Sequence, residues 1–320
     1  MSDKINWDAP SRFIEHADNP MPKAARVDVG MLRARDGAML RNAVFAPDSP
    51  RGTVVLMTGY SEFIEKYFET ICDLMAMGYA VVMPEWRAHG LSGGGGSEPT
   101  RLFIDDFDMN VTDLEDRWEK LVAPMPKPHF GLAHSMGGLI SLRAAHAHPD
   151  WFEKLAQSAP MLGLNLPAWV NVIMQFVVWT YAIRGKLDAW NLLDPPATRP
   201  SDAATNRITS DLVRFQRNEN LFMTEPQLQI NGRAPGWLRA AGRAMRDTAR
   251  PAYLKQITTP LFIGSAEKEA LVANAAHDKA LAHLPNGKGA FYAASMHELV
   301  MEKDAIRQAF LADVKAFFEA

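Results

Sequence analysis

The chain is poor in cysteine, with only Cys72 among its 320 residues. A single thiol excludes an internal disulfide framework. Cys72 stands in an apolar segment with helical spacing, so we expect it to be a packed thiol. The net charge is also small, at −3, and basic residues are not in excess. This balance gives no electrostatic basis for binding nucleic acid, and we expect no such partner.

The sequence has few features of a secreted or membrane-spanning protein. Its first residues, MSDKINWDAP, lack the charged and then apolar pattern of a signal peptide, so we expect a cytoplasmic protein. One long apolar run, residues 166–185, carries no charge before Arg184 and is near the lower length limit for a membrane span. Polar residues interrupt it, and no second span follows. We interpret it as a buried or cleft-lining helix. The alternative is peripheral contact of this surface with the inner membrane.

No nucleotide or metal motif stands out in the chain. Residues 92–100 contain four glycines, but no Lys-Ser or Lys-Thr pair follows them to contact a phosphate. His146 and His148 are two residues apart on a predicted helix, so their side chains point in different directions. We therefore expect neither a metal ion nor an organic cofactor.

Strand and helix patterns do alternate along the chain. Residues 26–37 and 38–47 alternate between polar and apolar, and Asp36-Gly37 lies at their junction, which predicts a β-hairpin. After the hairpin, short apolar runs alternate with amphipathic segments. This order predicts a mostly parallel sheet with helices on both faces. The predicted strands are 53–59, 79–85, 129–133, 154–160, 258–265 and 289–295, and the predicted helices are 62–78, 105–122, 136–148, 274–283 and 304–318.

The strand pattern lapses between about residues 161 and 250. This region is rich in Trp, Pro, Asn and Arg, and its helical segments carry no strand alternation. We therefore expect one core domain, made of residues 1–160 and 251–320, with a helical cap inserted at residues 161–250.

The predicted cap contains two groups of residues that bear on a ligand. Three aromatic residues would line a substrate pocket, with simple packing of the cap as the alternative; they are Trp169, Phe176 and Trp179. Four arginines are interpreted as a solvated helix face, with a phosphate head group as the alternative; they are Arg233, Arg239, Arg243 and Arg246.

Ser135, in the stretch FGLAHSMGG, lies between a predicted strand and a predicted helix. Small residues flank it at Ala133 and Gly137, as a nucleophilic serine on a sharp strand-to-helix turn requires. The usual pattern has glycine on both sides, so Ala133 departs from it by one methyl group. A helix N-cap serine is the alternative explanation.

The partners that a nucleophilic serine needs follow in order along the chain. His297 lies between the last predicted strand and the last helix, where a general base would sit at the carboxyl ends of the strands. The loop after residue 265 offers two acids to orient it, and we favour Glu269 over Glu267. The backbone N–H groups of Met136 and Tyr60 are the candidate oxyanion donors.

Four segments together resemble the serine-hydrolase branch of the α/β-hydrolases, and within it bacterial lysophospholipases and monoacylglycerol lipases. They are TGYSEFIEKY at 58–67, PEWRAHGLSGG at 84–94, LAHSMGG at 132–138 and the His-Glu-containing stretch from Met296 to the C-terminal helix. The resemblance implies an eight-stranded α/β-hydrolase sheet with a cap after strand 6.

By this resemblance, Ser135, Glu269 and His297 would be a catalytic triad, with Tyr60 and Met136 as oxyanion donors. Glu62, Arg87 and His89 would be structural supports. Thr58 replaces the family's histidine, and its hydroxyl could hold that turn instead.

The expected activity is hydrolysis of acyl-lipid esters through an acyl-enzyme, with a small-molecule acyl ester or lysolipid as substrate. A carboxylesterase of small non-lipid esters is one alternative, and a non-catalytic binding protein on a hydrolase scaffold is another.

Overall fold

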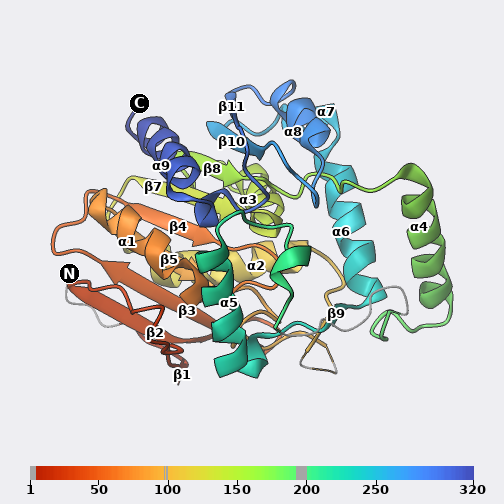
Figure 1. Cartoon of the computed structure of the whole chain (residues 1–320), viewed down its shortest axis with the longest axis horizontal. Coiled ribbons are helices and arrows are strands. Elements are labelled where there is room, and N and C mark those ends of the chain that lie inside the picture. The colour runs from red at the N-terminus through yellow and green to blue at the C-terminus, as the bar shows by residue number, and fades with distance from the viewer. Residues whose placement is uncertain (1–4, 97, 99, 192–199) are drawn as a thin grey trace.

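The computed structural model describes residues 5–96, 98, 100–191 and 200–320 (Figure 1). Parts of the glycine-rich stretch (residues 97 and 99) and of the predicted cap (residues 192–199) therefore lie outside the described residues. The chain forms one large sheet with helices on both faces, and further helices stand beyond one edge of it.

The central sheet has the strand order β1-β2-β3-β5-β4-β7-β8-β10-β11. Its strands are β1 Ala9–Pro10, β2 Arg26–Arg33, β3 Met39–Ala46, β4 Thr53–Met57, β5 Ala80–Pro84, β7 His129–His134, β8 Lys154–Ser158, β10 Leu261–Ala266 and β11 Gly287–Tyr292. The predicted hairpin is confirmed, because β2 and β3 pair antiparallel through eight residue pairs, and Gly37 in the turn has φ of +90°. From β5 to β11, all neighbouring strands are parallel.

Among the residues that the structure describes, the sheet has nine strands rather than the expected eight. The additional strand is β1, a two-residue segment that pairs with β2 so that Ala9 lies opposite Met31. Two residues are too few to show an alternating pattern, so this strand could not be predicted from the sequence. The eight expected strands are all present.

Two sets of helices cover the sheet. The helices are α1 Phe68–Ala76, α2 Asp108–Arg117, α3 Met136–Ala147, α4 Ala168–Ile183, α5 Leu212–Thr224, α6 Pro235–Thr248, α7 Pro251–Leu254, α8 Asn274–Leu281 and α9 Asp304–Glu319. Buried side chains of α1 and α9 share one apolar core with one face of the sheet. Those of α2, α3 and α8 share the core on the other face. The fold is therefore the predicted α/β-hydrolase arrangement.

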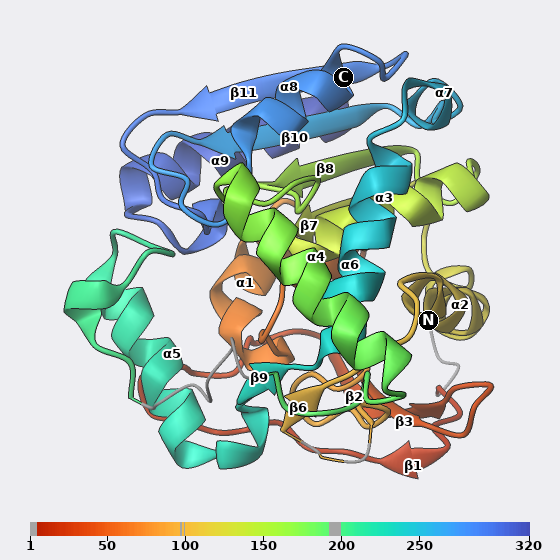
Figure 2. The same cartoon turned by 90° about the vertical axis from the view of Figure 1, so that its right-hand side faces the viewer.

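Helices α4, α5 and α6 lie in the chain between β8 and the short helix α7, which precedes β10. Figure 2 shows α4 lying across α6 on the outside of the molecule. In the same view α5 stands to the left, apart from both helices. A short parallel pair, β6 (Arg101–Leu102) with β9 (Gly232–Arg233), joins a loop of the sheet domain to this region. These helices stand beyond the carboxyl ends of the parallel strands, where open α/β sheets place their sites.

Two expectations about apolar segments can be compared with the structure. In the described part of the chain, no helix is both long enough and apolar enough to cross a membrane. The expectation for Cys72 was wrong, since its side chain is exposed on α1. Ile71 and Leu74 take the buried side of that helix instead.

Candidate active site

Ser135 lies on a strained turn between β7 and α3. Its φ of +48° and ψ of −112° are unusual for a residue with a side chain. A Cβ atom on Gly137 would lie 2.5 Å from the Thr58 carbonyl oxygen, so only glycine fits there. The Ser135 side chain makes no capping hydrogen bond to α3. The geometry is therefore that of a strained nucleophile turn and not of an ordinary helix cap.

The structure brings the other two predicted triad residues to this serine. His297 Nε2 lies 2.9 Å from Ser135 Oγ, and His297 Nδ1 lies 2.8 Å from Glu269 Oε2. The three residues lie in the loops that follow β11, β7 and β10, although 162 positions separate the serine from the histidine. This chain of contacts has the order that nucleophilic serine catalysis requires.

Glu269, rather than Glu267, contacts the histidine. The other carboxylate oxygen of Glu269 accepts hydrogen bonds from the backbone N–H groups of Leu271 and Val272, at 2.8 and 3.2 Å. Burial alone would raise the pKa of Glu269, but these bonds and the one with His297 lower it below its usual value. Glu267 is exposed and accepts a hydrogen bond from the Ala294 N–H instead.

The two predicted oxyanion donors flank the serine. Met136 is the first residue of α3, so its N–H has no acceptor within the helix. Tyr60 lies in the loop after β4, where the Gly59 N–H donates to Glu62 Oε2 and the Trp86 indole N–H donates to the Thr58 carbonyl at 2.8 Å. The expectation for the Thr58 hydroxyl was wrong, because that buried oxygen has no partner among the described residues. Trp86 supports the turn instead.

Arg87 and His89 both belong to the loop after β5. The Arg87 guanidinium makes two hydrogen bonds of 2.7 Å to the Asp113 carboxylate on α2. The buried His89 ring donates from Nδ1 to the Arg87 carbonyl at 2.8 Å, and its ring lies edge-on to Tyr60. These contacts hold the loop against the sheet domain beside Tyr60.

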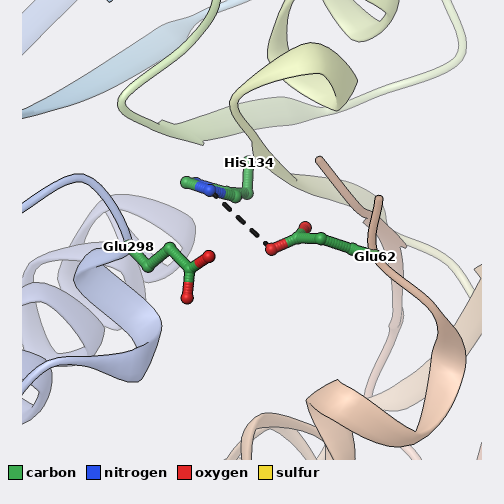
Figure 3. Close-up of side chains that lie close together, drawn as sticks. All are labelled: Glu62, His134 and Glu298. Carbon is green, nitrogen blue, oxygen red and sulfur yellow. Dashed lines mark ion pairs between the residues drawn. The ribbon is translucent and has the colours of Figure 1, made fainter. Parts of the chain in front are cut away.

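A buried group of charges lies below the serine, and sequence reasoning missed most of it. Lys66 Nζ lies 2.7 Å from Glu62 Oε1 and 2.6 Å from Glu298 Oε1. Figure 3 shows Glu62, His134 and Glu298 converging on a common space. Their ligand atoms lie within 4.8 Å of one another, as a metal site would require. We assign no metal to them, because the Lys66 ammonium already lies between the two carboxylates and supplies the positive charge that they need.

This environment shifts the pKa values of the buried groups. Burial would raise the pKa of Glu62, but the positive charge of Lys66 lowers it to about 2. Burial lowers the pKa of His134 to about 4, so its imidazole is neutral near pH 7. Burial raises the pKa of Glu298. The sequence signal for the Lys66 pairing was its place four residues after Glu62, which is helical spacing for an ion pair.

Ser135 lines a cavity of about 790 Å³ beneath α4 and α6. Most of its lining side chains are apolar, including Met161, Leu162, Trp237, Met245 and Val272. A cavity of this size and polarity suits a largely apolar ligand.

The three aromatic residues predicted for the pocket do not line this cavity. Trp169 and Phe176 are 67% and 62% exposed, and Trp179 lines a smaller hollow that adjoins the cavity. The expectation failed because α4 turns Asn171, Met174 and Gln175 toward the cavity and its large aromatic side chains toward solvent.

The four cap arginines separate into two pairs. Arg239 lies 3.6 Å from Asp105, and Arg243 lies 3.2 Å from Asp106. These two belong to the outer face of α6, as interpreted from the sequence. Arg233 and Arg246 are among the residues that line the cavity.

Fold and site together define an α/β-hydrolase with a Ser-His-Glu constellation at the carboxyl ends of its strands. Residues 48–304 match the model of the family described as serine aminopeptidase, S33. The chain belongs to that family, and it is an ester hydrolase.

Individual relatives agree with this assignment. The chain is 29% identical to lysophospholipase L2 of Escherichia coli strain K12, over 83% of this chain and 79% of that protein. It is 32% identical to a monoacylglycerol lipase of Mycolicibacterium smegmatis, over 72% and 74%. A solved structure of monoglyceride lipase from Saccharomyces cerevisiae has a TM-score of 0.72 at 19% identity, covering 93% of this chain and 97% of that one.

Proposed function

We propose that this protein is a serine hydrolase that cleaves acyl-lipid esters of the lysophospholipase or monoacylglycerol lipase type through an acyl-enzyme. The observation that carries the proposal is the unbroken chain from Ser135 Oγ through the His297 ring to Glu269. The names of the relatives support the lipid character of the substrate.

In the proposed reaction, His297 takes the Ser135 proton as the serine oxygen attacks the ester carbonyl. The N–H groups of Met136 and Tyr60 stabilise the oxyanion that develops. His297 then protonates the departing alcohol, which leaves the acyl group on Ser135. A water molecule, deprotonated by His297, attacks the acyl-enzyme and releases the fatty acid. Glu269 orients the imidazole and stabilises its charged form throughout.

The apolar cavity favours a long acyl chain over a short one. Its volume of about 790 Å³ lies in the range of sites that enclose ligands of lipid or drug size. We therefore propose that the acyl chain occupies this cavity, with residues 161–250 forming a cap over it. A small-ester carboxylesterase would leave most of that volume unused.

Labelling with a fluorophosphonate probe tests the catalytic serine. We expect labelling of the wild-type protein and its loss in Ser135→Ala. Ser141→Ala is the matched control, because Ser141 lies on α3 and bonds to the Gly138 carbonyl away from both His297 and the cavity. A folded wild-type protein that does not label would favour the non-catalytic binding protein.

Activity on p-nitrophenyl esters of increasing acyl length tests the substrate class. A lipid enzyme is expected to show kcat/KM rising with chain length. Activity confined to short acyl chains would favour the carboxylesterase.

The outer face of α4 suits contact with a lipid surface. Its apolar side chains are between 47% and 67% exposed; they are Trp169, Val172, Ile173, Phe176, Trp179 and Ile183. The polar side chains Asn171 and Gln175 face the cavity instead. Because a contiguous set of exposed large apolar side chains often marks a membrane-interaction site, this face supports peripheral membrane contact.

Co-sedimentation with phospholipid vesicles tests this contact. We expect the wild-type protein to pellet with vesicles and the Trp169→Ser/Phe176→Ser/Trp179→Ser variant to remain in the supernatant. A matched variant carries the same kind of change at an exposed apolar residue on another face, Phe291→Ser in β11. Equal sedimentation of all three proteins would contradict the membrane contact.

A further inference from the structure

The loop that carries His297 is closed by the carboxylate of Glu302. Glu302 is fully buried, and its Oε1 accepts a hydrogen bond of 2.7 Å from the backbone N–H of Met296, the residue before the histidine. This bond spans the histidine, so residues 296–302 form a small closed loop, named here the histidine loop. A shift of the backbone at Met296 would have to stretch or break the bond to Glu302.

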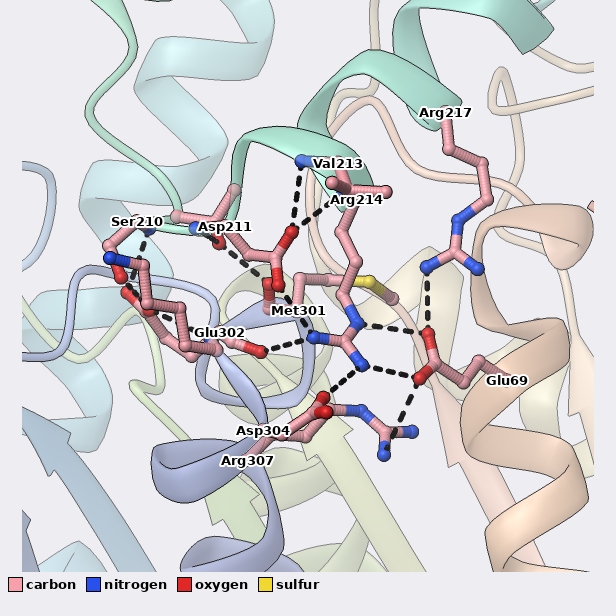
Figure 4. Close-up of polar contacts among 12 residues, drawn as sticks. Glu69, Ser210, Asp211, Val213, Arg214, Arg217, Met301, Glu302, Asp304 and Arg307 are labelled. Carbon is pink, nitrogen blue, oxygen red and sulfur yellow. Dashed lines mark hydrogen bonds and ion pairs between the residues drawn. The ribbon is translucent and has the colours of Figure 1, made fainter. Parts of the chain in front are cut away.

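The same carboxylate is bonded to the proposed cap. The Ser210 N–H donates to Glu302 Oε1 at 3.1 Å, and the Ser210 hydroxyl donates to Oε2, although 92 positions separate the two residues. The Lys303 N–H also donates to Oε2, at 3.2 Å. Figure 4 shows Ser210 and Glu302 side by side, close to the start of α5. Each oxygen of Glu302 therefore accepts two hydrogen bonds, and the carboxylate joins the cap to the histidine loop.

Two further hydrogen bonds join the same two segments. The Thr209 hydroxyl donates to the Met301 carbonyl at 2.6 Å, and the Glu298 N–H donates to the Ile208 carbonyl at 2.8 Å. Thr209 is only 1% exposed, so water has little access to its hydroxyl. The cap thus bonds to the backbone that directly follows the histidine.

The cap segment that makes these bonds, residues 208–210, is followed by a firmly held helix. On the first turn of α5, the Arg214 guanidinium donates to the Glu302 carbonyl at 2.8 Å (Figure 4). It also bonds to Glu69 on α1 at 2.9 Å and to Asp304 on α9 at 2.7 Å. One guanidinium therefore connects α5 to two helices of the sheet domain and to the histidine loop. These contacts make the segment a fixed support for that loop.

We propose that Thr209, Ser210 and Glu302 are positioning residues for the proposed general base, so that the cap contributes to catalysis by holding the histidine in place. This inference rests on the proposed function. None of the three lines the cavity beneath α4 and α6, so they act through the histidine loop. The His297 Nε2 atom lies 2.9 Å from Ser135 Oγ, and a displacement of about 1 Å at a catalytic group can slow a reaction about 100-fold.

Kinetics per reactive serine test this role in the full-length protein. Complete labelling with a fluorophosphonate probe counts the molecules that have a reactive serine, and kcat for one p-nitrophenyl ester is divided by that count. For Thr209→Val and Ser210→Ala we expect complete labelling, with kcat per labelled site about tenfold lower and KM within about twofold of the wild type. The rate of labelling should fall in parallel, because the same histidine activates the serine in both reactions.

Two matched variants show whether the hydroxyl groups carry the effect. Ser210→Thr retains a hydroxyl, so its kcat per labelled site should stay within about threefold of the wild type. Thr205→Val makes the same change as Thr209→Val at an exposed residue of the proposed cap. The Thr205 hydroxyl bonds to the Asp202 carbonyl at 2.9 Å and not to the histidine loop, so this variant should match the wild type.

A double variant shows whether Ser210 acts through Glu302. Glu302→Gln keeps the shape of the side chain but replaces one accepting oxygen with an amide nitrogen, so two of the four donors lose their acceptor. We expect it to lower kcat per labelled site by about tenfold or more. In Ser210→Ala/Glu302→Gln the loss should be smaller than the product of the two single losses, because both changes interrupt the same connection.

Two results would overturn the inference and leave the proposed function intact. One is a kcat per labelled site that equals the wild-type value in both Thr209→Val and Ser210→Ala. The other is an equal loss in Thr205→Val, which would show that bonds to the histidine loop are not the cause. A wild-type protein that neither labels nor hydrolyses the ester would instead overturn the proposed function itself.

Discussion

Glu298 and Lys66, 232 residues apart in the chain, form a buried ion pair of 2.6 Å below the site. Glu298 directly follows His297, whereas Lys66 also bonds to Glu62, which accepts a hydrogen bond from Gly59. One ammonium group therefore joins the histidine loop to the loop that carries Tyr60. The relative position of His297, the proposed base, and Tyr60, the proposed oxyanion donor, depends on this contact.

Lys66→Met is expected to destabilise the protein by about 3 kcal/mol or more, because it leaves two buried carboxylates without a cation. Urea unfolding followed by tryptophan fluorescence measures the change. Lys279→Met, at an exposed position on α8, should change the free energy of unfolding by less than about 0.5 kcal/mol. Equal stability of the two variants would show that the buried pairing contributes little.

Glu269→Gln is expected to lower kcat by a factor of about 10² to 10⁴, since an amide cannot stabilise the charged His297 ring. Glu267→Gln removes a carboxylate of the same loop that contacts Ala294 rather than the histidine. Its kcat should stay within about twofold of the wild type. Steady-state kinetics with one p-nitrophenyl ester compares both variants, and a larger loss at position 267 would contradict the assignment.

Gly137→Ala is expected to destabilise the fold and abolish labelling of Ser135. Its new methyl group would lie 2.5 Å from the Thr58 carbonyl oxygen and 2.6 Å from that of Met57, and neither backbone can move without shifting β4. We expect a loss of about 3 kcal/mol or more. Gly242→Ala on α6 is the contrast in thermal unfolding, because its methyl group would meet only the end of the Arg246 side chain, at 3.4 Å. That variant should be as stable as the wild type or more so.

Stability is expected to fall as the pH is lowered from about 7 to about 4. Burial lowers the pKa of both His89 and His134 to about 4 in the folded protein, from an ordinary value of 6.5. Between these values the unfolded chain binds more protons than the folded chain, so acid favours unfolding. Each histidine contributes on the order of 3 kcal/mol across this range.

Urea unfolding at about pH 7 and about pH 4.5 measures this dependence. His89→Gln keeps a polar side chain that does not titrate, so its pH dependence should be shallower than that of the wild type. An identical dependence in both proteins would exclude His89 as a source.

The sequence predicted the sheet domain well because each element there obeys a local rule. Alternation around Asp36-Gly37 predicted the hairpin, and Gly78 ends α1 with φ of +90°. The positions of Ser135, Glu269 and His297 were predicted from their places after three strands of one parallel sheet, since parallel strands bring their carboxyl ends to one edge.

The features that could not be predicted from the sequence are those that depend on contacts between residues far apart in the chain. The side chain of Lys66 is buried because its partners come from separate loops, one of them 232 residues away. The side of α4 that faces the protein was also not predicted, because a helix that is apolar on nearly all sides does not show which one is buried.

A second opening of about 310 Å³ meets Ser135 on the α5 side, and Glu62, Lys66 and His297 line it. In the proposed reaction, the acyl chain stays bonded to Ser135 and fills the cavity beneath α4 until water cleaves the bond. The polar opening would give that water a path that the chain does not block. Deacylation would then need no displacement of the chain from its cavity.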